Sequence, residues 1–115
     1  MDEPLGRSTI EEHGWELVSA EERAAAAPDT FHIPPRAMRE SLSPGDVAKL
    51  LFDIETREGG RVVDRGVDRM WVVIKAKTAV GYIGALDNDP GAAENVRLHQ
   101  GDFIVFGPEH VADIG

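Results

Sequence analysis

The chain has 115 residues, 42% of them hydrophobic and 29% charged, which suits one folded domain and excludes a disordered chain. Its 21 acidic and 12 basic residues give a formal net charge of −9, which repels phosphate backbones and anionic headgroups. Nucleic acid and membrane surfaces are therefore not expected partners. Because there is no cysteine, disulfides, thiolate zinc sites and a cysteine nucleophile are excluded, and a cytoplasmic location is expected.

Residues 1–14 are acidic and show no periodicity, so the sequence predicts a flexible N-terminal arm followed by a single domain over residues 15–115. The first residues lack the basic and apolar segments of a signal peptide. The longest apolar run, Met70–Ile74, is far below the ~20 residues that a membrane-spanning helix needs.

Two short helices are predicted next. In "SAEERAAAAP", Ser19 is placed to cap the first turn, Glu22 completes a capping box, and Pro28 ends the helix. In "FHIPPRAMRESL", Pro35 stands near the start of a second helix. The residues expected to face inward there are Ala37, Met38 and Leu42.

The next segments alternate as strands do. In "SPGD", Pro44 and Gly45 occupy the central positions of a type II turn, and "VAKLLFDI" after it has one apolar face. "RMWVVIKAK" predicts a second strand, and a tight turn at Thr78-Ala79 joins it to a third, "VGYIGALD". Gly81 and Gly84 inside the third strand indicate a bend or a close approach of backbones.

The C-terminal third is interpreted as turns and caps. Asp89 and Pro90 predict one or two turns of helix over "DPGAAENV". "HQGD", ending at Asp102, repeats the earlier Gly-Asp turn before a fourth strand, "FIVF". "DNDPG" is not a calcium loop, because such loops place acidic residues at alternate positions.

Arginines recur at every fourth position from Arg57 to Arg69. Gly59, Gly60 and Gly66 favour a solvated hairpin loop here over a basic helical stripe, and a contact patch for an acidic partner is the minority interpretation.

His110 and Asp113 stand three apart, so on one helical turn they would share a face and could bind a metal or orient a base. The favoured interpretation is a structural His–Asp hydrogen bond, and no metal, cofactor or catalytic residue is predicted. Trp71 lies on the mixed face of its strand, where core burial is favoured over an open binding anchor. The candidate binding residues are Trp71, Asp87, Asn88, Asp89, Asp102, His110 and Asp113.

Residues 30–114 resemble a bacterial family of small domains of unknown function, related to proteins encoded beside polymorphic toxin systems and regarded as immunity factors. The pattern that carries the resemblance is Trp71-Val72-Val73, then GxLDNDP, then GDxxxFxxxHxxD. In this chain it begins at Trp71, reaches Pro90 in its second part, and runs from Gly101 to Asp113. The resemblance implies an immunity-type interaction domain, and it supplies no catalytic residues.

The sequence thus predicts an α+β domain in which a curved, mostly antiparallel sheet of four to five strands carries short helices on one face. The function expected is a non-enzymatic binding module that meets a basic protein partner or a second copy of itself. The alternative is a small metal-dependent hydrolase using the acidic residues and His110. The expected core is Ala48, Leu50, Phe52, Val72, Ile74, Ile83, Leu86, Ile104 and Phe106.

Overall fold

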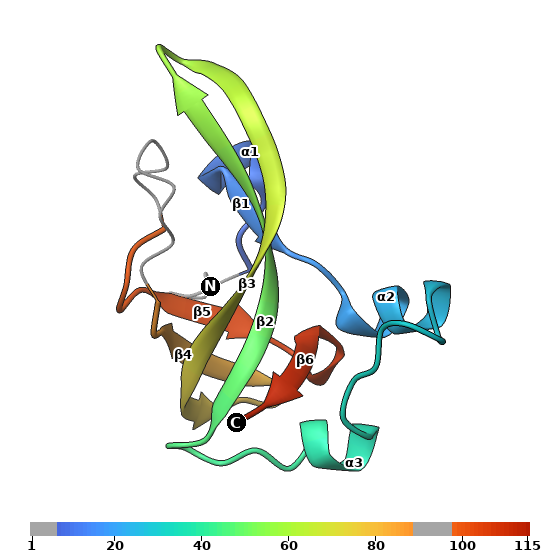
Figure 1. Cartoon of the computed structure of the whole chain (residues 1–115). Helices are drawn as coiled ribbons and strands as arrows, with labels where there is room; N and C mark the ends of the chain where they lie inside the picture. Colours follow the sequence, from blue (N-terminus) through green and yellow to red (C-terminus); the bar gives the residue numbers. More distant parts are fainter. Residues whose placement is uncertain (1–6, 89–97) are drawn as a thin grey trace.

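A computed structural model describes residues 7–88 and 98–115, and it has the predicted α+β architecture (Figure 1). Within these residues, three short helices and a 3-10 turn accompany a curled antiparallel sheet of six strands. The helices are α1 (Ile10–His13), α2 (Ala20–Ala26) and α3 (Arg36–Arg39), and the 3-10 turn is η1 (Pro108–His110). The strands are β1 (Trp15–Leu17), β2 (Val47–Glu58), β3 (Arg61–Lys77), β4 (Tyr82–Leu86), β5 (Phe103–Phe106) and β6 (Val111–Ile114).

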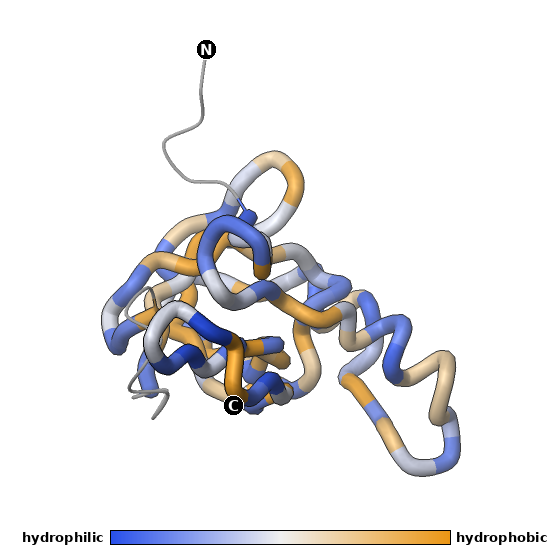
Figure 2. The backbone as a smooth tube through the Cα atoms, turned by 90° about the horizontal axis from the view of Figure 1, so that it is seen from above, coloured by the Kyte–Doolittle hydropathy of each residue, from blue (hydrophilic) through white to orange (hydrophobic). Residues whose placement is uncertain are grey.

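Five strands follow one another across the sheet in the order β1-β2-β3-β4-β5, and β6 also pairs with β2. β1 and β6 lie on different stretches of β2: Trp15 is opposite Ile54, whereas Ile114 is opposite Ala48. Seen from above, hydrophobic stretches of chain gather in the curled sheet (Figure 2). No helix in the described residues is long and apolar enough to cross a membrane.

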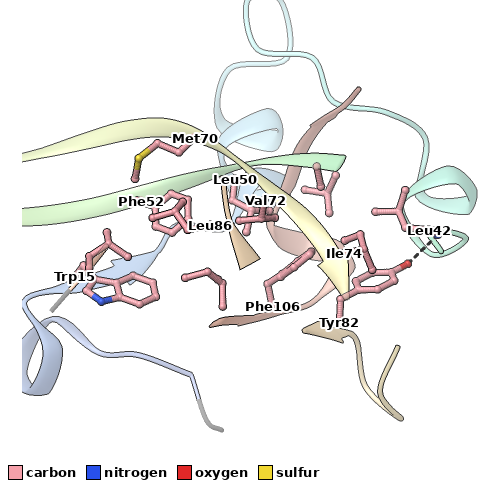
Figure 3. Packing of buried hydrophobic residues seen from close by; sticks show 14 of the residues in the cluster. Trp15, Leu42, Leu50, Phe52, Met70, Val72, Ile74, Tyr82, Leu86 and Phe106 are labelled. Carbon is pink, nitrogen blue, oxygen red and sulfur yellow. Dashed lines mark hydrogen bonds between the residues drawn. The ribbon is translucent and has the colours of Figure 1, made fainter. Parts of the chain in front are cut away.

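The core lies on the concave side of the sheet, where alternate residues of β2 and β3 meet aromatic rings from β1, β4 and β5 (Figure 3). Of the predicted core residues all are buried except Ile83, which is only half-buried. β4 turns Tyr82, Gly84 and Leu86 inward, so Ile83 faces the other side. The Tyr82 ring packs 5.3 Å from that of Phe106, and its hydroxyl donates to the Arg39 carbonyl at 2.7 Å.

Gly81 and Gly84 have the close backbone approach that the sequence indicates. A β-carbon at Gly81 would lie 2.3 Å from the Phe106 carbonyl oxygen, and one at Gly84 would lie 3.0 Å from that of Val73. Backbone atoms cannot move aside as a flexible side chain can. Glycine therefore lets β4 lie tightly against its neighbours at these two points.

The helices confirm some predictions and correct others. Ser19 caps α2 by accepting a hydrogen bond from the Glu22 amide at 3.1 Å. Leu42 is buried as predicted, but Ala37 and Met38, which were expected to face inward, are exposed. Arg39 is buried in their place, because three oxygen acceptors surround its guanidinium. The domain also begins before residue 15, since α1 falls within the predicted arm and buries Ile10.

The arginine-rich segment is not a loop. Only Gly59 and Gly60 make the turn, with φ of +59° and +83°, and Gly66 lies inside β3. A glycine pair with positive φ is the usual turn between two tightly paired strands. Residues 55–68, named here the distal arm, therefore form a two-stranded ribbon that projects beyond the rest of the sheet (Figure 1).

Candidate functional site

Asp87 and Asn88 close the end of the β3–β4 pairing. The Asn88 side-chain oxygen accepts a hydrogen bond from the Trp71 amide at 2.6 Å, and the Asp87 amide donates to the Trp71 carbonyl at 2.9 Å. These two residues thus satisfy backbone groups at a strand end. Asp89 and the helix predicted over 89–96 lie outside the described residues.

Asp102 is a turn residue, as predicted. Its carboxylate accepts from the His99 amide at 2.8 Å, and its own amide donates to the His99 carbonyl at 3.1 Å. Asp46 makes the same pair of bonds with Ser43, at 2.8 and 3.0 Å. In both turns the glycine before the aspartate has a positive φ, so the two Gly-Asp segments adopt the same kind of turn.

His110 and Asp113 do not form the predicted hydrogen bond. His110 ends η1 and is buried, and its Nδ1 accepts from the Gly107 amide at 3.0 Å. Asp113 lies on β6, is exposed, and accepts from the adjacent Ile114 amide at 2.9 Å. The two belong to different elements, because the chain becomes extended at Val111. Within residues 7–88 and 98–115, no three His, Asp or Glu side chains are grouped to hold a metal ion.

Burial lowers the pKa of His110 below its usual value, and the neighbouring Arg7 guanidinium, 3.4 Å from Nε2, acts in the same direction. The charges of Glu109 and Glu21 oppose this shift. Because Nδ1 accepts a hydrogen bond, the neutral ring carries its proton on Nε2. A second proton would have to take the place of the Gly107 bond, so the fold favours neutral His110.

Acidification should therefore weaken the fold through His110. The unfolded chain binds this proton more readily, so the stabilisation is complete above about pH 6.5 and is lost below it. Between about pH 7.5 and 5.5 we expect the unfolding free energy to decrease, measured by urea denaturation. His110→Asn, which keeps an acceptor for Gly107, should flatten this dependence, and exposed His32→Asn should not. An equal loss in His110→Asn would contradict the assignment.

The structure places Trp71 on the convex face of the sheet, half-buried, and not in the core. The Lys49 ammonium lies over its ring, 4.7 Å from the centroid. One step along the same face, the Arg69 guanidinium lies 5.6 Å from the centroid of the Phe31 ring. Sequence reasoning missed Lys49, Arg69 and Phe31 as a group. The available signal was register, because Arg69 and Trp71 are alternate residues of one strand.

These residues adjoin a groove of about 370 Å³ between the segment before α3 and the convex face of β2, β3 and β6. Its volume is at the lower end of the range for ligand-binding sites. The residues that line it are Thr30, Phe31, His32, Ile33, Pro34, Lys49, Arg69, Ala112 and Asp113. Of the predicted site residues, only Asp113 lines this groove, so the structure does not bring the predicted set together.

No protein-family model, curated protein or solved structure matches the chain.

Proposed function

We propose that the protein is a non-enzymatic binding module that contacts a protein partner through the distal arm. The arm is exposed along both strands beyond Thr56, with three exposed valines, Val62, Val63 and Val67, at 45%, 50% and 38% exposure. A two-stranded ribbon is only marginally stable by itself in water, and exposed apolar residues on it suit a contact surface.

The edge of the arm supports the same proposal. β4 pairs with β3 only from Val72 onward, so among the described residues the stretch 61–70 of β3 pairs with β2 alone. Its outward backbone groups can add a strand from a partner, a frequent mode of peptide recognition. The arm is thus the observation that carries the proposal.

The net charge supports a basic partner, because an acidic protein attracts and steers a cationic one before contact. The resemblance to immunity-type proteins supports the same kind of partner. In this proposal the long-range charge brings the two proteins together, and the distal arm supplies the contact.

Self-association through the β3 edge is less favoured. A two-fold antiparallel pairing that aligns Val63 with Val67 would set Arg65 opposite its own copy and Arg61 opposite Arg69. Like charges directly opposite each other destabilise a strand pair. A partner strand of different sequence avoids this repulsion.

The alternative of a metal-dependent hydrolase receives less support. Asp102 and Asn88 accept backbone hydrogen bonds at turns and strand ends, and His110 accepts one in the interior. General acid–base chemistry instead needs such groups close together around one reacting atom. The described residues offer no such convergence.

Partner capture from cells that make the protein tests the proposal. We expect the wild-type chain to retain a basic protein at ~0.05 M salt and to release most of it at ~0.5 M. The neutral double variant Val62→Gln/Val63→Gln should lose that protein, since it removes apolar contact area from the arm. Val80→Gln is the matched control, because Val80 is 79% exposed in the turn between β3 and β4.

Two results would count against the arm as the contact surface. One is retention of no protein at low salt. The other is equal retention by the double variant and the wild type, with thermal denaturation showing that both are folded.

A further inference from the structure

The groove on the convex face carries two cations that the described carboxylates leave unpaired. Lys49 on β2 and Arg69 on β3 are diagonal neighbours on one side of the sheet, since Lys49 is opposite Trp71 and Arg69 is opposite Leu51. Five other arginines, from Arg7 to Arg65, form ion pairs within 4.0 Å, but within the described ranges Lys49 and Arg69 form none. Arg23, Arg61, Lys75 and Lys77 also form no ion pair in these ranges, but only Lys49 and Arg69 line this groove, so it holds two unpaired positive charges side by side.

Both cationic groups are held in place by aromatic rings. The Lys49 ammonium lies over Trp71 and the Arg69 guanidinium over Phe31, and each contact stabilises the extended side chain. A cation already held in position loses less conformational freedom when it binds an anion. The planar guanidinium also matches the two oxygens of a carboxylate.

The wall formed by residues 30–34 suits an extended chain. The Thr30 and Phe31 amides both donate to the Ala27 carbonyl, at 3.2 and 2.9 Å. The His32 and Ile33 amides have no hydrogen-bond partner in the part of the chain that the structure describes. Main-chain groups of this kind can pair with those of a bound peptide.

The opposite wall adds an acceptor. Asp113 on β6 lines the groove and is opposite Lys49 in the sheet, yet no ion pair joins them. A carboxylate beside the cations disfavours a free polyanion, whereas it can accept the N–H groups of a peptide. The groove thus presents donors for an anionic side chain and an acceptor for the main chain that carries it.

We propose that this groove binds an acidic peptide segment in extended conformation, with Lys49 and Arg69 holding one of its carboxylates. The groove residues lie outside the distal arm, so this site and the proposed function can fail independently. The ligand class is a glutamate- or aspartate-containing segment of another protein.

The test uses the full chain and a short synthetic peptide in which glutamate alternates with valine. Binding is followed by Trp71 fluorescence, since a carboxylate that draws Lys49 from the indole ring changes its emission, and by calorimetry. Lys49→Gln and Arg69→Gln should each weaken binding about tenfold or more, because each removes a charge-assisted hydrogen bond. Lys49→Arg should restore most of the affinity. Lys75→Gln, an exposed lysine of β3 outside the groove, should bind as the wild type does.

Three results would overturn the proposal. The first is equal binding of a matched peptide with glutamine in place of glutamate. The second is an equal loss in Lys75→Gln, which would reduce the effect to overall charge. The third is binding of inorganic phosphate at Lys49 and Arg69 without binding of the glutamate peptide, which would make the groove a simple anion site.

Discussion

Replacing Phe106 with alanine is expected to lower the free energy of unfolding by about 3–5 kcal/mol. The Phe106 side chain is fully buried on β5, packs against the Tyr82 ring, and lies against Gly84, where no β-carbon fills the space (Figure 3). Alanine would leave a cavity at the centre of the core. Since small domains are stable by only about 5–15 kcal/mol, this variant should denature at far lower urea concentration.

Phe103 on the same strand is the matched control. It is 58% exposed, so Phe103→Ala should change the unfolding free energy by no more than about 0.5 kcal/mol. Comparable losses for the two variants would mean that β5 is not oriented as described.

Replacing Arg39 with methionine is expected to lower the unfolding free energy by about 2–3 kcal/mol. Arg39 is 6% exposed and donates to the carbonyls of Pro34 and Pro108, at 2.8 and 2.9 Å, and to Glu21 at 2.7 Å. Methionine keeps the apolar stem but removes all three bonds. Glu21 keeps its bond from Arg36 and the Pro108 carbonyl keeps that from the Val111 amide, whereas no other donor in the described residues bonds to the Pro34 carbonyl. The measurement is urea denaturation near neutral pH.

Arg36→Met is the control that separates the effect of buried hydrogen bonds from the effect of losing a positive charge beside Glu21. Arg36 bonds the same Glu21 oxygen at 2.6 Å but is exposed, so its loss should lower the unfolding free energy clearly less than the loss of Arg39 does. If the two variants proved equally destabilising, the ion pair with Glu21 and not the buried carbonyl bonds would hold α3 in place.

Most of the strands could be predicted, because the alternation of apolar residues and the residues that form turns can both be read from short stretches of sequence. Ala48, Leu50 and Phe52 repeat every second residue, and Gly-Asp marks the turns before β2 and β5. The distal arm was mistaken for a loop because three glycines were weighted alike. Gly59 and Gly60 turn the chain, whereas Gly66 continues β3.

The residues whose burial or grouping the sequence did not predict depend on contacts between segments that are distant in sequence. Ile83 is excluded from the core because β4 turns the alternate residues Tyr82, Gly84 and Leu86 inward, where the Tyr82 ring packs against Phe106 of β5. Arg39 is buried because η1 brings the Pro108 carbonyl to it from far along the chain. The pair Lys49 and Arg69 likewise appears only when β2 and β3 are aligned.

The shared edge of β2 has a consequence for the order in which the protein folds during synthesis. On the edge of β2 that faces away from β3, the stretch at Ala48 gains its partner only when Ile114 has emerged from the ribosome, although β1 and β3 are available earlier. Long-range strand pairing is intrinsically slow and leaves edges open meanwhile. Until then, half of the paired positions on this edge of β2 have no partner strand. We expect a chaperone that binds the nascent chain to be most useful at this stage.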